Sequence, residues 1–424
     1  MPERVGNGGH VKINTGDTAW VLAAAALVMF MTPGLALFYG GMVRAKNVLG
    51  MLMQNFFCLG LVSILWAAAA YSLAFSGSGK YLGNFDLAWM RDVATTPPTG
   101  FALTIPPLAF LAFQLMFAVI TPALITGALA DRMRWSAWVW FVGLWLFLVY
   151  TPVAHWVFSP EGWLFKRGAL DFAGGTVVHI NAGIAALVAC IILGRRRGWP
   201  QHPMVPHSLP LTLIGAGILW FGWFGFNAGS ALAGNEIAAL ALVNTHMAAA
   251  AALVSWLIVE RWRTGHATTL GAASGLVAGL VAITPCAGFV NGMSPIYIGL
   301  IAGAVCALAV NAKFKLGFDD SLDVVGVHMV GGIVGSLAVG LFAATAANPA
   351  VVDEGLFNGG GLHLLGQQFI AVVATLVWSG IVTAIILLVM MRVMPHGIRV
   401  DDEAEEQGLD LSQHSETAYA YDRV

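Results

Sequence analysis

The chain has 424 residues, of which 58% are hydrophobic and only 10% are charged, and its mean hydropathy is +0.79. A soluble domain carries roughly 25% charged residues, so this composition excludes an ordinary soluble protein and indicates one that is embedded in a lipid bilayer. The formal net charge of −2 gives no sign of a nucleic-acid partner, and none is expected.

Apolar runs recur along the whole chain. Residues 1–17, before the first run, are polar and lack the charged-then-apolar order of a cleavable signal, so the first run is expected to be retained. Each run is long enough to cross a hydrocarbon layer of about 30 Å, or nearly so. The predicted fold is an all-α polytopic membrane protein with eleven transmembrane helices, at residues 18–43, 50–75, 102–130, 135–158, 173–194, 209–231, 237–260, 267–288, 295–311, 325–345 and 365–393.

Basic residues are unevenly divided between the loops that join these spans. If the N-terminus lies outside, most of the 20 Lys and Arg residues fall on the inner side, where basic residues are favoured. The sequence therefore predicts a multi-pass protein of the cell membrane, whether an inner or a plasma membrane, with its N-terminus outside and its C-terminus in the cytoplasm.

One pattern of residues occurs twice. Asp171 precedes His179 by eight residues, as Asp320 precedes His328, and each histidine is followed four residues later by Gly and then Ile. The two segments are the fifth and tenth spans. An odd number of spans in each half makes the halves enter the bilayer in opposite directions, which is the pattern of an inverted repeat. The tripeptide Ile-Thr-Pro, at 120–122 and 283–285, gives weaker support.

This repeat divides the chain into seven parts. Two five-helix halves flank a basic linker, and a final helix and a polar tail follow them. In chain order the parts are an extracellular N-terminal segment (1–17), the first five-helix repeat (18–194), a cytoplasmic basic linker (195–208), the second, inverted five-helix repeat (209–345), an external loop (346–364), the eleventh transmembrane helix (365–393) and a cytoplasmic regulatory tail (394–424).

The two histidines are the first candidate site. Eight helical residues rise about 12 Å, so His179 and His328 lie near the middle of a layer of about 30 Å. Ionisable rings at that depth indicate a functional site, although a packing role, with each ring bonded to a neighbouring carbonyl, is the alternative. A catalytic zinc usually has three protein ligands. The apolar spans offer no third ligand, and the four cysteines lack metal-type spacing, so neither a metal nor another cofactor is expected.

Aromatic side chains form two further clusters, at residues 113–117 and 220–230. Glycines alternate with the aromatics in the second cluster, which suits close approach of a backbone or a ligand. A small cation at an aromatic mouth gains roughly 0.5–2 kcal/mol of cation–π attraction. Asp171 is expected either to supply an electrostatic field at this mouth or to fix its backbone, and capping of the fifth span is a compatible alternative.

Several long motifs carry a family resemblance. They read FYGG at 38–41, ALDFAGGTVVHIN at 169–181, GWFGFNAGS at 222–230, VVGVHMVGG at 324–332 and EQGLDLSQHSETAY at 406–419. With these motifs the chain resembles the ammonium transporter (Amt/MEP/Rh) family, and the tail favours its prokaryotic Amt branch. The resemblance implies a homotrimer with one pore through each protomer and ammonium or ammonia as the substrate.

The resemblance also implies roles for particular residues. It implies an outer ammonium site that involves Phe117, Ser230 and a Trp. It implies a gate of stacked Phe117 and Phe226. Below the gate it implies a twin-histidine pore of His179 and His328.

Around that pore, Trp223 is expected to line the vestibule or the pore wall. One position departs from the family pattern, because Phe158 stands where the family's vestibule Trp follows Ala-His-x-Val. The face of a Phe ring attracts a cation more weakly than that of Trp. Either recruitment is weaker in this chain, or Trp156 or Trp163 substitutes.

The tail, 394–424, is acidic and polar. Its composition alone is typical of a disordered, solvated end, and a docking or regulatory segment is the alternative. The resemblance implies that the tail crosses to a neighbouring protomer and helps a PII signal-transduction protein to plug the inner pore mouths. Its acidic run, 401–406, is expected to lie against the basic residues Arg195–Arg197, Arg261 and Arg263.

Energetics favour ammonia over ammonium as the species that passes the pore. A bare ion in an apolar pore carries a desolvation penalty of tens of kcal/mol. Losing a proton whose pKa lies roughly two units above 7 costs about 3 kcal/mol. The predicted function is therefore recruitment of NH4+, its deprotonation and conduction of NH3, with separate proton transfer left open. Two alternatives are an ammonium sensor that signals through the tail and an intramembrane hydrolase, for which the sequence offers no nucleophile.

Overall fold

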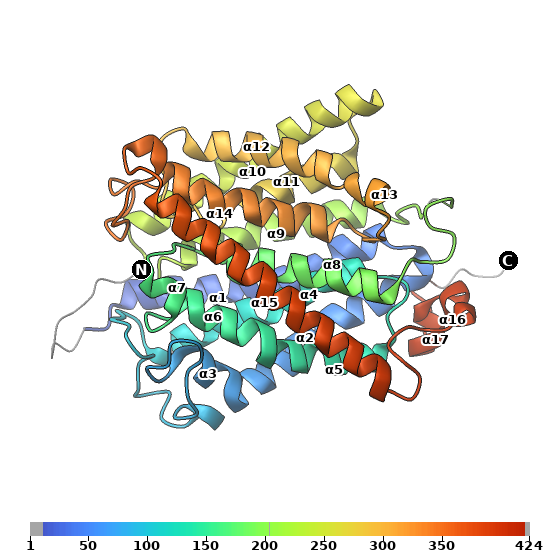
Figure 1. The fold of residues 1–424 in the computed structure, drawn as a ribbon, viewed down its shortest axis with the longest axis horizontal. Helices are drawn as coiled ribbons and strands as arrows, with labels where there is room; N and C mark the ends of the chain where they lie inside the picture. The colour runs from blue at the N-terminus through green and yellow to red at the C-terminus, as the bar shows by residue number, and fades with distance from the viewer. Residues whose placement is uncertain (1–11, 203, 420–424) are drawn as a thin grey trace.

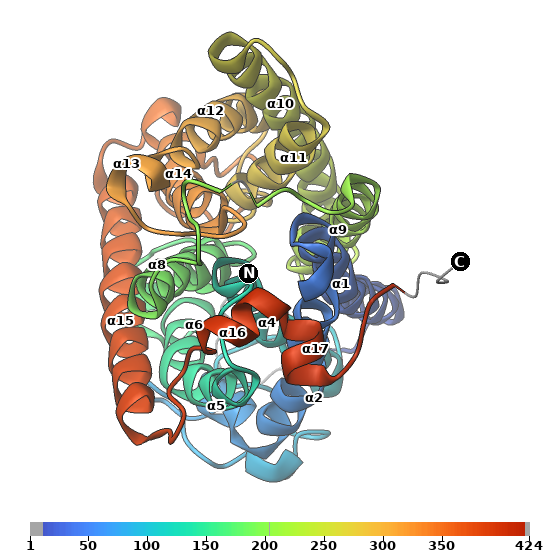
Figure 2. The same cartoon turned by 90° about the vertical axis from the view of Figure 1, so that its right-hand side faces the viewer.

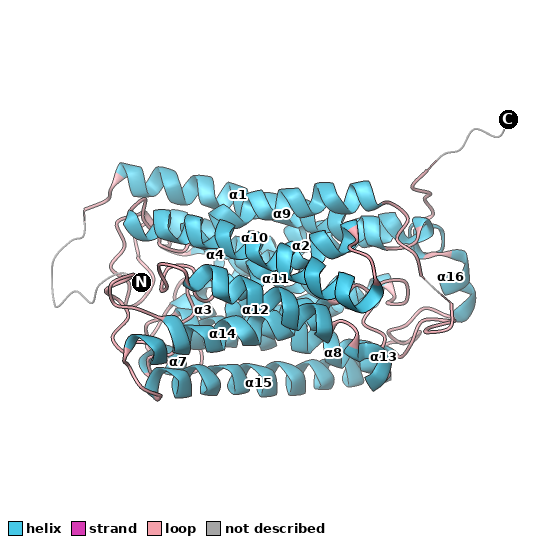
Figure 3. Cartoon of the chain, turned by 90° about the horizontal axis from the view of Figure 1, so that it is seen from above, coloured by secondary structure: helices cyan, strands magenta, loops and turns pink. Residues whose placement is uncertain are grey.

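The structure, a computed structural model, describes residues 12–202 and 204–419 as a bundle of helices joined by loops (Figure 3). Most of the helices run roughly along one direction, as in a membrane domain. Within the described ranges the only extended pairing is an isolated bridge between Met133 and Arg399. The expected all-α fold is confirmed.

The first half of the bundle contains five helical segments. Asn14 caps the first of them by accepting hydrogen bonds from the backbone N–H groups of Gly16 and Asp17, at 2.8 and 3.1 Å, so this helix begins slightly before the predicted residue 18. Several segments are interrupted by π-helical turns. The segments are α1 (Thr15–Met42); α2 (Val48–Leu65) with η2 (Trp66–Ala70) and α3 (Tyr71–Phe75); α4 (Pro107–Leu129); α5 (Trp135–Trp145) with η4 (Leu146–Tyr150), α6 (Thr151–Phe158) and α7 (Trp163–Lys166); and η5 (Gly175–Ile180) with α8 (Asn181–Leu193).

The second half also contains five helical segments. It is followed by one long helix and by two short helices in the tail. The elements are α9 (Leu209–Gly229), α10 (Glu236–Thr264), α11 (Thr269–Ile283), α12 (Ser294–Ala309) with α13 (Ala312–Leu316), η6 (Val325–Met329) with α14 (Val330–Phe342), α15 (His363–Val393), α16 (Asp402–Gln407) and α17 (Leu409–His414).

Ten of these segments are long and apolar enough to cross a membrane, and α11 is a shorter apolar helix of 15 residues. The predicted eighth span, 267–288, is therefore too long, because its helix ends at Ile283 and the chain continues in turns past Pro285. Proline restricts the residue before it and lacks a backbone donor, which ends the helix. The eleventh membrane crossing, by α11, stays a prediction.

The two ends of the bundle are distinct. α1 begins at one end, here called the N-terminal end, and α16 and α17 lie at the opposite end, here called the tail end (Figure 1). The long helix α15 crosses the bundle obliquely at its edge, where it contacts α5, α8 and α14 (Figure 2). It therefore touches both halves.

The tail is docked on the body of the protein. Asn47 accepts a hydrogen bond from the backbone N–H of Leu409 at 2.7 Å, and Asp410 accepts one from the backbone N–H of Gly50 at 2.8 Å. Asn47, directly before α2, thus supplies an acceptor at the N-terminus of α17, and Asp410 in α17 supplies one at the N-terminus of α2. The N–H groups at a helix N-terminus lack partners within the helix. Residues 402–414 are not the solvated end that composition alone suggests.

The acidic run meets only part of the predicted basic surface. Arg197 pairs with Asp402 and Glu406, at 4.0 and 3.3 Å, and both pairs are exposed. Among the salt bridges of the described residues, none involves Arg261 or Arg263, so that part of the predicted contact is absent within one chain.

Candidate functional site: a histidine pair between two crossed segments

Asp171 organises the start of the fifth span. Its carboxylate accepts hydrogen bonds from the backbone N–H groups of Gly174, Gly175 and Thr176, at 2.8, 2.6 and 2.8 Å, and a further bond from the Thr176 hydroxyl. These are the N–H groups that an opening helix leaves without partners. Burial raises the pKa of Asp171, and these hydrogen bonds act in the opposite direction. The carboxylate therefore fixes the backbone that leads to His179.

Asp320 does the same at the tenth span. Its two oxygens accept hydrogen bonds from the backbone N–H groups of Val324 and Val325, at 3.1 and 2.8 Å. Burial raises the pKa of Asp320 to about 6. The repeated spacing in the sequence thus corresponds to a repeated local structure, with a buried carboxylate ahead of each π-helical segment.

The two segments start from opposite ends of the bundle. The residue before Asp171 is bound by Gln368, near the start of α15. The residue before Asp320, Asp319, is instead bound by Arg196 at the tail end. The two segments therefore enter the bundle in opposite directions, as an inverted repeat requires.

Two glycines allow the segments to cross closely. A Cβ at Gly183 would lie 2.6 Å from the Cα of Met329, and one at Gly332 would lie 3.2 Å from the Cβ of His179. These are the glycines that follow each histidine by four residues. A larger residue at Gly183 would force the backbone of Met329 to move, and one at Gly332 would force neighbouring side chains to move, so the close crossing accounts for both glycines of the repeated motif.

The crossing brings His179 and His328 together. Their Nδ1 atoms are 3.3 Å apart, and their rings are stacked with centroids 5.4 Å apart. Both side chains are buried, and Nε2 of His179 has no hydrogen-bond partner in the structure. One ring nitrogen donates and the other accepts in a neutral pair, so His179 keeps a nitrogen available for a small polar molecule.

Trp223 forms the wall beside this pair. Its ring is stacked on His179 with centroids 5.5 Å apart, and its Nε1 donates a hydrogen bond to the Thr284 hydroxyl at 2.8 Å. The sequence had suggested only that Trp223 lines a vestibule or pore wall. Thr284 was not predicted as a site residue, although it belongs to the repeated Ile-Thr-Pro motif that could have indicated it.

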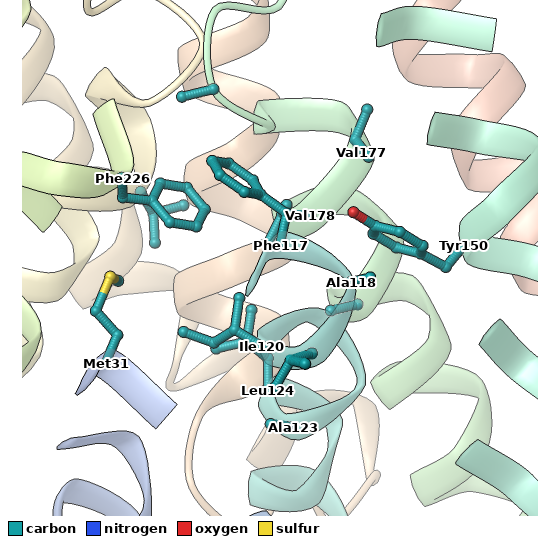
Figure 4. Packing of buried hydrophobic residues seen from close by; sticks show 14 of the residues in the cluster. Met31, Phe117, Ala118, Ile120, Ala123, Leu124, Tyr150, Val177, Val178 and Phe226 are labelled. Carbon is teal, nitrogen blue, oxygen red and sulfur yellow. The ribbon is translucent and has the colours of Figure 1, made fainter. Parts of the chain in front are cut away.

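A small cavity lies beside the two histidines, and its other lining side chains are aliphatic or aromatic. Figure 4 shows Ile120 and Leu124 below the rings of Phe117 and Phe226, with Met31 to one side. The lining residues are Met31, Leu35, Phe38, Ile120, Leu124, Val178, His179, Leu219, Trp223, Phe226, Val277 and His328.

A stacked pair of aromatic rings lies beside this cavity, which Phe226 lines. The rings of Phe117 and Phe226 are 4.2 Å apart and nearly parallel, at 24° (Figure 4). Phe158 meets Phe117 edge-on, with centroids 6.3 Å apart. The hydroxyl of Ser230 donates to the backbone carbonyl of Phe226 at 2.8 Å, which places Ser230 one helical turn further along α9. The structure thus brings Phe117, Phe158 and Phe226 together, whereas Trp220 of the second aromatic cluster stacks on His246 instead.

Neither tryptophan considered as a substitute for Phe158 stacks with Phe117. The ring of Trp156 packs against Trp163 and Trp378, and its Nε1 donates to the carbonyl of Tyr81 at 2.8 Å. Phe158 itself is the side chain that meets Phe117 edge-on at this position. Over the described parts of the chain, no group of three or more His, Cys, Asp or Glu side chains converges as metal ligands would.

Comparisons with known proteins identify the family of this chain. The model of the Ammonium Transporter Family matches residues 19–419. An ammonium transporter of Mycobacterium tuberculosis is 51% identical over 434 residues, covering 96% of this chain and 90% of that protein. The crystal structure of Candida albicans Mep2 has a TM-score of 0.87 at 36% identity and covers 92% of this chain and 88% of its own. A solved structure described as a sensor Amt protein has a TM-score of 0.86 at 31% identity, covering 94% and 98%. With its membrane-type helical bundle and a match over nearly its whole length, this chain belongs to the ammonium transporter family.

Proposed function

We propose that this protein recruits ammonium at the aromatic mouth beside Phe117, Phe158 and Phe226, removes its proton and conducts ammonia past His179 and His328. The observation that carries the proposal is the histidine pair, because the other side chains described along this cavity are aliphatic or aromatic.

The apolar lining selects the neutral species. A dehydrated ammonium ion against such walls carries a desolvation penalty of tens of kcal/mol, whereas deprotonation costs about 3 kcal/mol near neutral pH. Ammonia still needs hydrogen bonds on its way. The unpartnered Nε2 of His179 offers one at mid-depth, and the stacked indole of Trp223 holds that imidazole ring in place.

The mouth acts on the ion before it enters. Aromatic faces attract a cation by roughly 0.5–2 kcal/mol, and the buried carboxylate of Asp171 fixes the backbone of the neighbouring pore segment. Ser230, next to Phe226, offers a hydroxyl at the rim. The proton that ammonium loses either returns to the outer solution or follows through the histidine pair.

The protein is further proposed to act as a homotrimer in the cell membrane, with the N-terminal end outside and the tail end in the cytoplasm. The distribution of basic residues supports this orientation. The docked tail is then available to a cytoplasmic PII protein, which is proposed to block the inner pore mouths.

Vesicles that contain a pH-sensitive dye test the conducted species. Ammonia that enters alone takes up a proton inside, so an ammonium jump is expected to make the lumen alkaline faster than in protein-free vesicles. A solid-supported membrane then reports whether charge moves with it. Alkalinisation at the protein-free rate, with no charge movement, would contradict the proposal.

A second candidate function is an ammonium sensor that signals through its tail and conducts little. It is favoured by the similarity to the structure described as a sensor Amt protein and by the docking of α17 against α2. The same vesicle measurement separates the two functions, because a sensor is expected to bind ammonium without appreciable flux.

A further inference from the structure

The helix α15 carries a row of buried polar side chains. Gln368, Thr375, Ser379 and Thr383 are each at most 1% exposed. α15 lies outside the two repeats, at the edge of the bundle (Figure 2). Because a buried polar group is unfavourable without a partner, the partners of these side chains indicate what the row does.

Gln368 binds the backbone directly before Asp171. Its Oε1 accepts a hydrogen bond from the backbone N–H of Leu170 at 2.7 Å, and its Nε2 donates to the carbonyl of Leu170 at 2.8 Å. The same Nε2 donates to the carbonyl of Ser336, in α14, at 2.9 Å. One side chain thus holds both backbone groups of Leu170 and ties them to the second repeat.

Ser379 binds at the other end of the same pore segment. Its hydroxyl donates to the carbonyl of Asn181 at 3.0 Å, where η5 passes into α8. The amide of Asn181 itself donates to the carbonyl of Val177 within the π-helical turn. A π-helical turn changes the register of the backbone hydrogen bonds, and Asn181 is the residue directly after that turn, so its contacts help to fix where the turn ends.

The two contacts match in spacing. Gln368 and Ser379 are eleven residues apart, which is about three helical turns and places them on one face of α15. Leu170 and Asn181 are also eleven residues apart, and they enclose Asp171 and His179. Other contacts of α15 lead elsewhere: Trp378 donates to Leu148, Thr383 accepts from Trp145, and the Thr375 hydroxyl bonds only within α15.

We propose that Gln368 and Ser379 are positioning residues for transport, which hold residues 170–181 at both ends and so keep His179 in register with His328. This inference rests on the proposed twin-histidine pore. A displacement of about 1 Å at a reacting centre can reduce a rate by up to roughly 100-fold, so contacts outside the pore are able to govern flux through it.

The test compares matched variants of α15. Gln368→Met removes the amide at similar length, Ser379→Ala removes one hydroxyl, and Thr375→Val is the control, because it removes a buried hydroxyl that bonds only to Ala371 of its own helix. Gln368→Glu is the conservative variant, since a protonated carboxyl both donates and accepts. Each variant is first checked for assembly by size-exclusion chromatography.

Two readouts are measured on the assembled proteins. Nitrogen-15 NMR of histidine-labelled protein reports the His179–His328 pair, with its signals assigned by their loss in His179→Ala and His328→Ala. Vesicle flux reports transport and discrimination against potassium. We expect Gln368→Met to shift or split the pair's signals and to lower ammonium transport about tenfold, in keeping with a displaced centre. Ser379→Ala is expected to act in the same direction but less, Gln368→Glu to restore part of the loss, and Thr375→Val to match wild type.

The inference is overturned if assembled Gln368→Met and Ser379→Ala proteins keep wild-type histidine signals and wild-type selectivity. If Gln368→Met does not assemble, Ser379→Ala alone tests the inference. Histidine signals in Ser379→Ala that differ from those in Thr375→Val then support it, and identical signals overturn it. The pore itself is tested separately: transport that survives His179→Ala contradicts the proposed function, while the NMR signals still decide the positioning role.

Discussion

At the scale of single residues, Asp171 acts through its two carboxylate oxygens, which accept hydrogen bonds from the backbone. Asparagine keeps one side-chain oxygen as an acceptor, whereas alanine leaves the buried N–H groups of Gly174, Gly175 and Thr176 without it. Each unsatisfied buried group costs about 1–3 kcal/mol. Asp171→Ala is therefore expected to unfold at lower temperature and transport less than Asp171→Asn. Thermal unfolding and vesicle flux check this, and wild-type behaviour in both variants would contradict it.

Asp320 gives a prediction about pH. Its folded-state pKa of about 6 lies above the ordinary value of 3.8, so between these values the folded protein binds more protons than the unfolded chain. Stability from this group is then present at low pH and is lost as the pH rises through about 6. The unfolding temperature of wild type relative to Asp320→Asn is expected to fall between about pH 4 and pH 7. A pH-independent difference between the two proteins would contradict the assignment.

The sequence indicated those residues whose spacing repeats. Asp171, His179 and their counterparts were found because the same intervals recur in both halves. Gln368 and Ser379 were not found, because their partners are backbone groups that lie 198 residues away in the sequence. A hydrogen bond to a distant carbonyl leaves no local pattern in either segment.

At the scale of elements, the tail docks through both buried and exposed carboxylates. Glu405 is 1% exposed and accepts hydrogen bonds from the backbone N–H of Arg197 and from Arg399, both at 2.7 Å. The ion pair of its neighbour Glu406 with Arg197 is exposed. An exposed pair contributes about 0–1 kcal/mol. Glu405→Gln is therefore expected to loosen the tail, as measured by limited proteolysis, whereas Glu406→Gln is not. Equal protection in the two variants would contradict this.

Removal of the tail is the coarser test at this scale. Deletion of residues 406–424 takes away α17 and its contacts with Asn47 and Gly50. The shortened protein is expected to assemble as the proposed trimer, with altered flux and weaker block by the host's PII protein. Pull-down and flux assays with and without the nucleotide ligands of PII check this. If full-length and shortened proteins are bound and blocked equally, the tail has no regulatory role.

Element boundaries could be predicted only in part. Apolar runs located the spans because the bilayer demands about 20 apolar residues in a helix. The π-helical turns η5 and η6 were not predicted, because their register depends on contacts from outside each segment, such as those of Asp171 and Asp320. The early end of α11 was signalled by Pro285, which the predicted span had included.

At the scale of the whole molecule, a buried ion cluster at the tail end joins the two repeats. Arg196, in the linker between them, binds Asp319 of the second repeat at 2.8 Å and lies 3.5 Å from Asp131 of the first. Removing one partner of a buried ion pair costs about 3–5 kcal/mol. Arg196→Met is therefore expected to lower the unfolding temperature strongly, and the exposed Arg195→Met to have little effect. Similar unfolding temperatures would show that the cluster does not hold the halves together.

The most direct test of the account is ammonium transport by the histidine variants. Proteoliposomes with wild type, His179→Ala, His328→Ala and the control His266→Ala, an exposed loop position, are compared for ammonium flux and for discrimination against potassium. The pore variants are expected to assemble normally but to lose most ammonium transport or its selectivity, while His266→Ala matches wild type. A correctly assembled His179→Ala protein with unchanged flux and unchanged selectivity would contradict the twin-histidine pore.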